Sequence, residues 1–567
     1  MSTLRTWIQS IALLLALATP GLAQQHEFMS GKNSLRIEFP HGHVYQYGFQ
    51  LVRVTATNVG SKPATWKTTL KEEVFNFGMR QGNTGELRLN FEVAPGEVVQ
   101  RDILMVMGNR DTSDGGGYWN EFTVSVDMPS GIVDNWSHRA ENSHGFHPSS
   151  VEVAPALYSR DAIGSLLDTY ISHSSRSAAM SGEPATDWRA YSAFALVVMT
   201  PAEWVAMPPA ARMALMDWVR LGGMLQFIGS IPESVPERSP DGVLGLGKVF
   251  SHDESGSDIP LQKLKAFQTI EAMRADISSK PELEARSFDR WLRENGLHEL
   301  LDDEFAIWLV VLVLIAFFVM ITPVNLFLLA PSRRRHRLFK TIPIISLAAC
   351  LALALAVVMG DGIGGNGQRL VLIESRSGDD NLHYISQWQA SDCGALFGSG
   401  FKVTDPAYMA PLGDLSSDFQ LDIVPDGLEA GGGWFASRSV QAQYLQAVRS
   451  SRGRIEWSQD SASYPVVTST FDFDVVDFHT RDKDGKWWHA PALTKGRPVQ
   501  LKPVDNKTAR QRIQRHTSAM PREHRIRDLS KIEGHYIAFT DQPPAIDTHG
   551  AIDWDDKGIV IGEIIQP

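Results

Sequence analysis

The sequence predicts a multi-domain protein with four parts: an N-terminal β-sandwich, an α/β domain with a parallel sheet, a two-helix transmembrane hairpin and a C-terminal β-rich domain. The 567 residues are too many for one hydrophobic core to organise. Short apolar runs, separated by turn residues, occupy both ends of the chain. Two uncharged apolar runs lie close together in mid-sequence, at 305–330 and 342–359.

The composition excludes some classes of partner and site. Charged residues make up 21% of the chain and the formal net charge is -12, so there is no basic footprint for nucleic acid. Of the two cysteines, Cys350 lies inside an apolar run and Cys393 in the polar region that follows. We therefore expect neither a disulfide nor a cysteine-based metal site.

Residues 1–23 have the pattern of a secretory signal peptide. Arg5 precedes an apolar stretch at 11–18, and Pro20 is followed by the small residues Gly21 and Ala23. Cleavage after Ala23 is the expectation, and an uncleaved anchor is the alternative. In both cases the residues that follow are exported.

A β-sandwich is predicted for residues 26–145. The alternating runs in this region cover 34–39, 50–58, 86–93, 98–106 and 122–127. The Asn58-Val59-Gly60 turn after one run and the Pro95-Gly96 turn before another resemble Ig-like domains of bacterial surface proteins. This resemblance implies a fold and no activity.

An α/β domain is predicted for residues 151–250. Helices are expected at 161–170 and 208–221, the second closed by Gly222-Gly223, and strands at 194–199 and 224–228. Alternation of strands and helices favours a parallel sheet.

The segment 188–230 resembles the glutamine-amidotransferase-like domain of many envelope proteins, and 245–249 fits the closing strand of that family. Catalysis in that family needs a cysteine at a sharp strand-to-helix turn. There is no cysteine between His26 and Cys350, and Ser230 lacks the flanking glycines of a nucleophile elbow. The resemblance therefore implies a non-catalytic relative, and Ser230 is interpreted as a turn residue.

A juxtamembrane helical stalk is predicted at 260–304, followed by transmembrane helices at 305–330 and 342–359. Acidic residues precede the first span and Asp361 follows the second, whereas the loop at 331–341 is basic. Its cations are Arg333, Arg334, Arg335, Arg337 and Lys340. Positive charge stays in the cytoplasm, so both flanking regions are expected outside it.

Polar and proline residues within the spans are interpreted as structural. Pro323 and Asn325 lie in the first span. Pro343 is expected near the first turn of the second span, where a missing N–H destabilises a helix least. Asn325 is expected to bond a neighbouring helix or carbonyl. The Pro323-x-Asn325-x-Phe327 span end, with the basic loop and second span, resembles a bacterial membrane family described by architecture alone.

A second β-rich exported domain is predicted at 368–567. Its clearest strands are at 369–374, 466–476 and 559–565. The glycine-rich stretch at 361–367 is interpreted as a flexible linker, because no helix or Lys-Ser/Thr pair follows it as in a phosphate-binding loop.

Two groups of side chains contain residue types that can bind a metal ion. His41 and His43 lack a third ligand and are interpreted as surface residues of a turn. The second group precedes the turn at 482–485 and could offer oxygens to calcium. It comprises Asp472, Asp474, Asp477 and His479. Asp472 and Asp474 alternate with Phe471 and Phe473, which instead favours the solvent-exposed face of a strand. The closing glutamate of an EF-hand loop is also missing. No metal site is therefore predicted.

The aromatic and basic residues of this last domain also have two interpretations. Trp487 and Trp488 could stack on a sugar, but a tryptophan in a core is commoner. The cations Lys507, Arg510, Arg512 and Arg515 have helical spacing and predict an exposed helix face.

These patterns favour an inner-membrane-anchored scaffold or interaction protein of the bacterial cell envelope, without catalytic, cofactor-binding or metal-binding residues. Its expected partners are the membrane and other envelope proteins, with the folded domains in the periplasm and the basic loop in the cytoplasm. One alternative is a glycan- or ligand-binding protein, which would expose Trp434, Trp487 or Trp488 in a groove. A hydrolase would need Ser230 beside a histidine and an acid. Two spans without buried charge do not favour a transporter.

Overall fold

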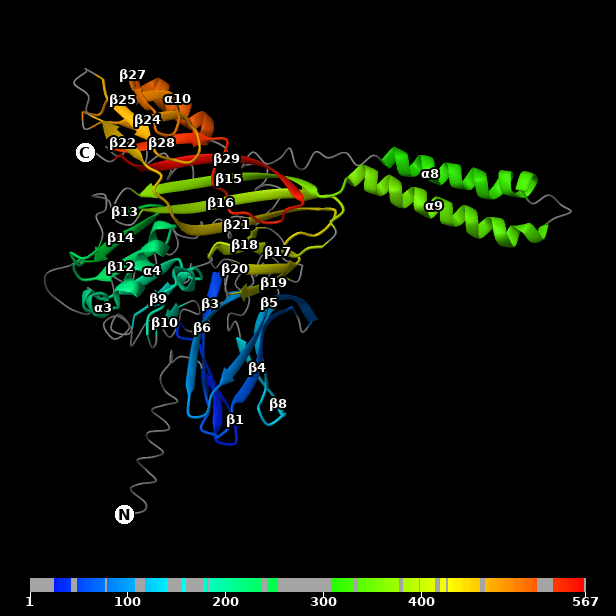
Figure 1. Cartoon of the computed structure of the whole chain (residues 1–567), viewed down its shortest axis with the longest axis horizontal. Helices are drawn as coiled ribbons and strands as arrows, with labels where there is room; N and C mark the ends of the chain where they lie inside the picture. The colour runs from blue at the N-terminus through cyan, green and yellow to red at the C-terminus, as the bar shows by residue number, and fades with distance from the viewer. Residues whose placement is uncertain are drawn as a thin grey trace, which may run out of the picture.

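The computed structural model has several domains, consists mostly of β-sheet, and includes two apolar helices (Figure 1). The predicted signal peptide at 1–23, helix at 161–170 and stalk at 260–304 lie outside the residues that the structure describes. These are residues 25–41, 48–76, 79–107, 118–140, 156–159, 177–180, 183–235, 242–252, 307–329, 335–376, 381–396, 398–412, 419–424, 427–458, 464–482, 484–517 and 534–564.

Two four-stranded antiparallel sheets form the N-terminal region. The first has the order β1-β2-β3-β6, with β1 (Gln25–Ser30), β2 (Asn33–Glu38), β3 (Gly48–Thr57) and β6 (Val98–Met107). The second has the order β5-β4-β7-β8, with β5 (Met79–Val93), β4 (Ala64–Asn76), β7 (Tyr118–Asp127) and β8 (Val133–Ala140). Leu35 and Ile37 of β2 are buried and Arg36 between them is exposed. This alternation is typical of a strand with one solvent-exposed face. A common core of aromatic and aliphatic side chains, including Trp66 and Phe122, joins the two sheets.

A six-stranded sheet follows, in the order β10-β9-β11-β12-β14-β13. Its parallel strands are β9 (Ala156–Tyr158), β10 (Ser177–Ala179), β11 (Leu196–Met199), β12 (Met224–Ile228) and β14 (Gly247–His252), and β13 (Val243–Leu244) is antiparallel. The helical segments here are η2 (Trp188–Tyr191), α3 (Pro201–Ala206) and α4 (Pro209–Arg220).

Local signals explain where α3 and α4 begin and end. Thr200 and Glu203 form a capping box at the start of α3. The helix predicted at 208–221 and the strand predicted at 224–228 are confirmed as α4 and β12. A Cβ on Gly223 would lie 2.4 Å from the Trp218 ring, so the turn after α4 requires glycine there.

The C-terminal region is β-rich, as predicted, and contains a nine-stranded sheet in the order β18-β21-β16-β15-β29-β28-β24-β25-β27. Only β15 and β29 pair in parallel within it. In chain order the strands are β15 (Gly365–Arg376), β16 (Leu382–Cys393), β18 (Tyr408–Leu412), β21 (Ser439–Ser450), β24 (Val475–Arg481), β25 (Trp487–Leu493), β27 (Lys502–Val504), β28 (His535–Thr540) and β29 (Ile552–Glu563).

Two three-stranded sheets and a helix complete this region. One sheet contains β17 (Phe401–Val403), β20 (Gly427–Gly432) and β19 (Phe419–Val424), and the other contains β22 (Ile455–Ser458), β23 (Val466–Ser469) and β26 (Pro498–Gln500). The helix is α10 (Asn506–Thr517). The single strand predicted at 466–476 is wrong, because residues 470–474 separate β23 from β24.

Three of the glycines after the second apolar helix, Gly364, Gly365 and Gly367, are closely packed, which corrects the interpretation of this stretch as a flexible linker. Gly365 and Gly367 belong to β15. A Cβ on Gly365 would lie 2.5 Å from the Asp392 carbonyl oxygen, and one on Gly367 would lie 2.4 Å from the Trp554 ring. Close approach of neighbouring strands therefore explains these glycines.

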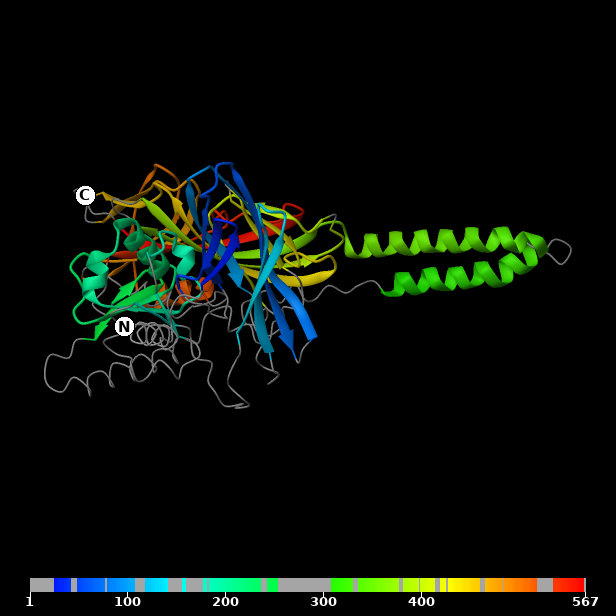
Figure 2. The same ribbon diagram turned by 90° about the horizontal axis from the view of Figure 1, so that it is seen from below.

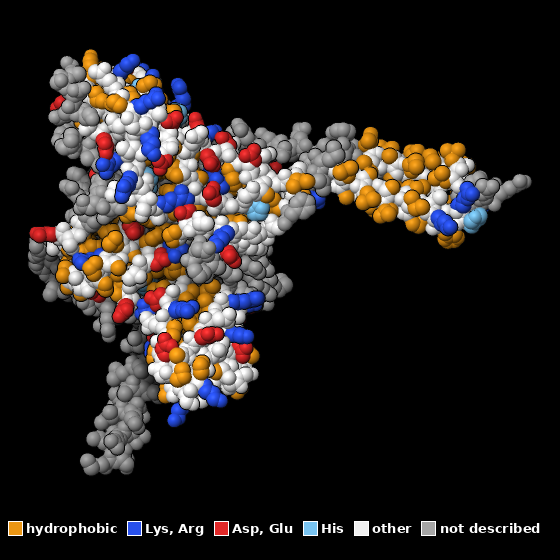
Figure 3. All heavy atoms as spheres, viewed as in Figure 1, with side chains coloured by type: hydrophobic (Ala, Val, Ile, Leu, Met, Phe, Trp, Pro, Cys, Tyr) orange, Lys and Arg blue, Asp and Glu red, His pale blue; other side chains and the backbone are white. Residues whose placement is uncertain are grey.

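The apolar hairpin consists of α8 (Ile307–Val319), η4 (Met320–Leu329), η5 (Arg335–Arg337) and α9 (Leu338–Asp361). Two helices, Val310–Leu329 and Arg335–Leu355, are long and apolar enough to cross a membrane. The hairpin stands away from the folded domains (Figure 2). Hydrophobic side chains cover it, and cations gather at its far end (Figure 3).

Prolines lie inside both helices of the hairpin. Pro323 lies in η4, which is a π-helix, and wider turns of this kind accommodate the missing N–H of proline. Pro343 is the sixth residue of α9, just beyond its first turn, because the helix begins at Leu338 and not at 342. Asn325 is buried, and the bond expected for its amide is not found among the described residues.

The segments before and after the hairpin share one hydrophobic core, to which α4 and strands β15, β16 and β21 contribute. The Tyr384 hydroxyl donates to Asp217 at 2.8 Å, and the Gln446 amide donates to the Leu221 carbonyl at 2.7 Å. Arg220 and Glu374 form an ion pair at 3.0 Å with side chains only 6% and 13% exposed. Removing one member of such a buried pair costs about 3–5 kcal/mol.

The N-terminal sheets contact the α/β region through η2. The amide of Phe49 donates to the Ser192 hydroxyl at 2.9 Å. Gly48 has a φ of +137°, and a Cβ there would lie 2.4 Å from the backbone of Ala193. The start of β3 is therefore held directly against the segment after η2.

His41 is buried in this contact, which corrects its interpretation as a surface residue. It is fully buried, stacks on Tyr191 with ring centroids 5.2 Å apart, and contacts the Ala190 carbonyl through Nδ1 at 3.3 Å. Burial lowers the pKa of His41 from 6.5 to about 4. His43 lies outside the described residues.

The depressed pKa of His41 predicts a loss of stability in mild acid. Below pH 6.5 His41 of the unfolded chain binds a proton, whereas His41 of the folded chain stays neutral down to about pH 4. The free energy of unfolding therefore falls by about 3 kcal/mol between these two pH values. Urea unfolding of the wild type and His41→Phe, followed by tryptophan fluorescence between pH 7 and pH 4, measures this difference. An equal pH dependence in both proteins would contradict the assignment.

Candidate functional site

Among the described residues, Ser230 and the three tryptophans do not form the catalytic or sugar-binding site that the alternatives to a scaffold would need. Ser230 follows β12 on the surface and, among the described residues, has no hydrogen-bonded histidine or acid. Trp434, Trp487 and Trp488 are buried, with at most 5% of their surface exposed. The prediction that Trp487 and Trp488 belong to a core is confirmed, and none of the three tryptophans forms an exposed stacking surface.

The acidic residues of the second metal candidate separate into two environments. Asp472 and Asp474 are exposed, as predicted for solvated residues, and Asp472 pairs with Lys495. Asp477 is half-buried on β24 and lies beside His479 of the same strand. Only the second half of the candidate group is thus brought together.

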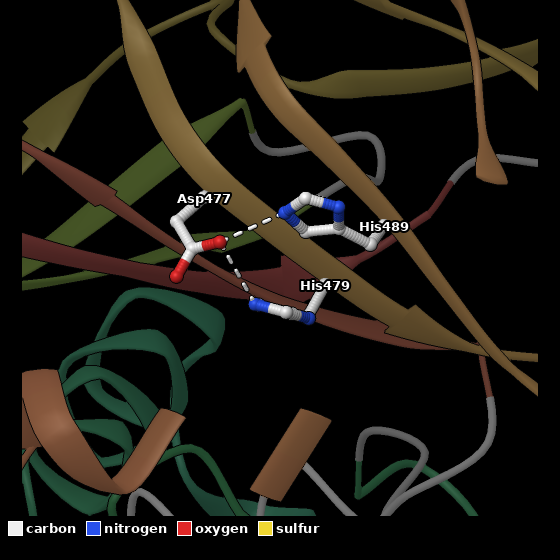
Figure 4. A group of neighbouring side chains, drawn as sticks. All are labelled: Asp477, His479 and His489. Atoms are coloured by element: carbon white, nitrogen blue, oxygen red, sulfur yellow. Dashed lines mark hydrogen bonds and ion pairs between the residues drawn. The ribbon is translucent and has the colours of Figure 1, made fainter. Parts of the chain in front are cut away.

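Asp477, His479 and His489 form a compact cluster at β24 and β25 (Figure 4). His479 and His489 are directly opposite in the antiparallel register, with ring centroids 4.8 Å apart. Asp477 Oδ1 lies 3.2 Å from His479 Nε2 and 2.8 Å from His489 Nε2. The side chain of His479 is fully buried, and those of His489 and Asp477 are 13% and 19% exposed.

A β-bulge positions the carboxylate. The pairing of β24 with β28 shifts register between Val476 and His479, and Asp477 within this shift has a φ of +46°. This is the left-handed region, which a non-glycine residue in a strand rarely adopts. Bulges re-aim side chains, and here the carboxylate points at both imidazoles (Figure 4).

Helix α10 adds two further groups from the other side of Asp477. Arg512 lies 2.9 Å from His489 Nε2 and 3.5 Å from Asp477 Oδ1. His516, one helical turn later, approaches Asp477 Oδ2 at 3.3 Å and stacks on Phe539. The predicted basic helix face is therefore confirmed for the exposed Lys507, Arg510 and Arg515, while Arg512 turns into the cluster.

Burial and the charges around it set the protonation of the cluster. Burial lowers the pKa of His479, and the nearby Asp477 offsets this only in part, so the ring is neutral at pH 7. Burial alone would raise the pKa of Asp477, but its interactions with His479 and His489 outweigh burial and hold the pKa well below its usual range. The cluster thus combines a carboxylate with a neutral buried imidazole.

This donor set is one that a divalent metal ion can use. Each of the three residues offers one ligand atom, and these atoms all lie within 4.8 Å of one another. Imidazole nitrogen and carboxylate oxygen are common ligands of zinc. His489, Arg512 and His516 were missed as members of the cluster. In a hairpin with its turn at 482–485, residue 489 pairs with residue 479, so the position of His489 could have been predicted from the sequence. No sequence pattern predicts the approach of the two α10 residues.

Comparisons with known proteins place the chain in no family. No family model and no curated protein matches it. Among solved structures, a protein from Archaeoglobus fulgidus matches 22% of this chain and 98% of its own, at 8% identity and a TM-score of 0.13. The Fcho1 Mu homology domain of Danio rerio matches 36% and 97%, at 9% identity and a TM-score of 0.20. Bacteroides uniformis beta-glucuronidase matches 83% and 60%, at 9% identity and a TM-score of 0.15. These scores are too low to carry an argument about fold or function.

The left-handed backbone at Asp477 predicts which substitutions the bulge tolerates. Asp477→Val should destabilise the protein by about 2 kcal/mol more than Asp477→Asn, because a β-branched residue is strained there and asparagine is not. Urea midpoints measure the difference. The same two substitutions at the exposed Asp474 serve as the control and should differ by less than about 0.5 kcal/mol. Equal effects at both positions would contradict a strained bulge.

Proposed function

We propose that this chain is an inner-membrane-anchored scaffold or interaction protein of the bacterial cell envelope, which holds its folded domains outside the cytoplasm as binding surfaces. The observation that carries the proposal is the hydrophobic core shared by segments before and after the apolar hairpin. Such a core requires both segments to lie in one compartment. A hairpin that enters and leaves the membrane on the same side meets that requirement.

The charge pattern of the hairpin supports the orientation. Arg335, Arg337 and Lys340 are exposed and lie in or close to the segment that joins the two helices. Figure 3 shows Lys and Arg side chains at the far end of the hairpin, beyond the apolar surface. Positively charged loops remain in the cytoplasm. In the proposed topology the folded body therefore lies in the periplasm, where the signal-peptide-like segment at 1–23 would direct it.

The domain types that fit this role are binding modules. The two packed antiparallel sheets are compatible with an Ig-like domain, and the parallel sheet around β11 and β12 with a non-catalytic amidotransferase-like domain. Both assignments rest on the sequence resemblances at 26–145 and 188–230. The exposed Ser230 without described catalytic partners supports a binding role over hydrolysis.

The free end of the N-terminal sandwich offers a specific contact surface. Strand register places the β1–β2, β3–β4, β5–β6 and β7–β8 connections at this end, because Ser34 pairs with Thr57, Thr57 with Val98, and Asp127 with Val133. Apolar side chains here are 55–62% exposed, and we call them the apolar tip. It comprises Met29, Val59, Val98, Ile132 and Val133. Exposed apolar side chains that share one end of a domain are a candidate protein interaction site.

Charge placed in the apolar tip should weaken capture of envelope partners. We expect Val98→Glu with Ile132→Glu to lower recovery of crosslinked envelope proteins in an affinity pull-down about tenfold, equivalent to 1.4 kcal/mol. The matched control is Val205→Glu with Met213→Glu, which charges equally exposed apolar residues of α3 and α4. Recovery that falls equally in both variants, or in neither, would contradict an interaction role for the tip.

A further inference from the structure

The cluster at β24, β25 and α10 contains a buried imidazole that is paired with the Asp477 carboxylate but is poorly hydrogen-bonded. Both ring nitrogens of His479 are buried, and neither makes a well-aligned hydrogen bond to any described residue. Its Nε2 points toward Asp477 at 3.2 Å. Leaving a buried polar atom unsatisfied costs about 1–3 kcal/mol. A ligand that accepts the lone pair of this nitrogen would remove that cost.

His489 Nε2 has two neighbours that it cannot satisfy together. Arg512 is always a donor and lies 2.9 Å from this nitrogen, while the ionised Asp477 is only an acceptor and lies 2.8 Å from it. With a proton on Nε2 the contact to Arg512 places two donors together. Without a proton, the contact to Asp477 places two lone pairs together. A cation bound by both Nε2 and Oδ1 resolves this conflict once Arg512 withdraws.

The backbone already holds these atoms in place. His479 and His489 are cross-strand partners inside the nine-stranded sheet, and the strained bulge directs Asp477 at both. Backbone strain of this kind concentrates at functional sites. Arg512 and His516, in contrast, come from α10 with side chains 41% exposed, so the helix side of the cluster has room to rearrange.

We propose that Asp477, His479 and His489 bind a divalent transition-metal ion of the zinc class. Two imidazole nitrogens and one carboxylate match zinc, whereas calcium and magnesium prefer oxygen ligands only. The fourth position belongs to water or to His516, which contacts the second carboxylate oxygen of Asp477 at 3.3 Å. Bound metal would tie α10 to the β24–β25 pair. This site is independent of the scaffold role proposed above.

Equilibrium dialysis of the full-length, chelator-treated chain in detergent against Zn²⁺, with bound metal counted by mass spectrometry, tests the proposal. The wild type should retain one zinc ion per chain. His489→Gln should lower the affinity more than about 100-fold, a loss beyond that typical of removing a residue that only orients a ligand. Co²⁺ in place of zinc should show the visible absorption of a low-coordinate site, which His489→Gln abolishes.

Two further variants separate this site from adventitious binding. His535→Gln removes another histidine beside a carboxylate, Glu563 at 3.5 Å, and should leave the affinity unchanged. Arg512→Gln removes the competing cation and should tighten binding on the order of tenfold. No zinc retained by the wild type, or equal losses in His489→Gln and His535→Gln, would overturn the proposal. The wild-type result decides the matter even if His489→Gln fails to fold.

Discussion

The hydrophobic core shared across the hairpin is the constraint on which the rest of the structure depends. Residues 253–306, which lie outside the described part, and two apolar helices separate β14 from β15 along the chain. Even so, α4 packs on β15, β16 and β21 as neighbours within one domain would. A hydrophobic core cannot form across a bilayer. If the hairpin enters a membrane, its two ends therefore have to lie on the same side of that membrane. Two crossings meet this requirement, whereas one or three crossings would not.

Buried polar contacts fix the position of α4 against the strands that it packs on. The Arg220–Glu374 pair, the Tyr384–Asp217 hydrogen bond and the Gln446 bond to the Leu221 carbonyl lie together where α4 ends. Apolar burial alone would tolerate sliding of α4 over the sheet, whereas each of these contacts is satisfied in one register only. At the opposite side, the turn after η2 meets β3 so closely that Gly48 has no room for a Cβ. The α/β region is thus held at one end by the C-terminal sheet and at the other by the N-terminal sheets.

Local sequence patterns predicted the elements whose causes are local. β2, β6, α4 and β12 fall within a residue or two of their predicted bounds, because alternation, capping and glycine stops act within a few residues. The errors at His41 and at the glycines of β15 share another cause, because each of these residues packs against a neighbour far along the chain. The candidate site also has a part that local sequence patterns predict and a part that they do not. Asp477 and His479 were visible in the sequence and His489 follows from hairpin register, whereas the bulge and the approach of α10 are set by packing against β28 and β25.

Site-directed labelling tests the shared-compartment constraint most directly. Single cysteines would replace Ser230 before the hairpin, Lys557 after it and His336 at its far end, all exposed, in a background carrying Cys350→Ser and Cys393→Ala. A membrane-impermeant maleimide applied to intact spheroplasts should label positions 230 and 557 equally, and position 336 only after the membrane is permeabilised. Labelling of position 336 in intact spheroplasts, or of only one of positions 230 and 557, would contradict a single body held on one side of the membrane.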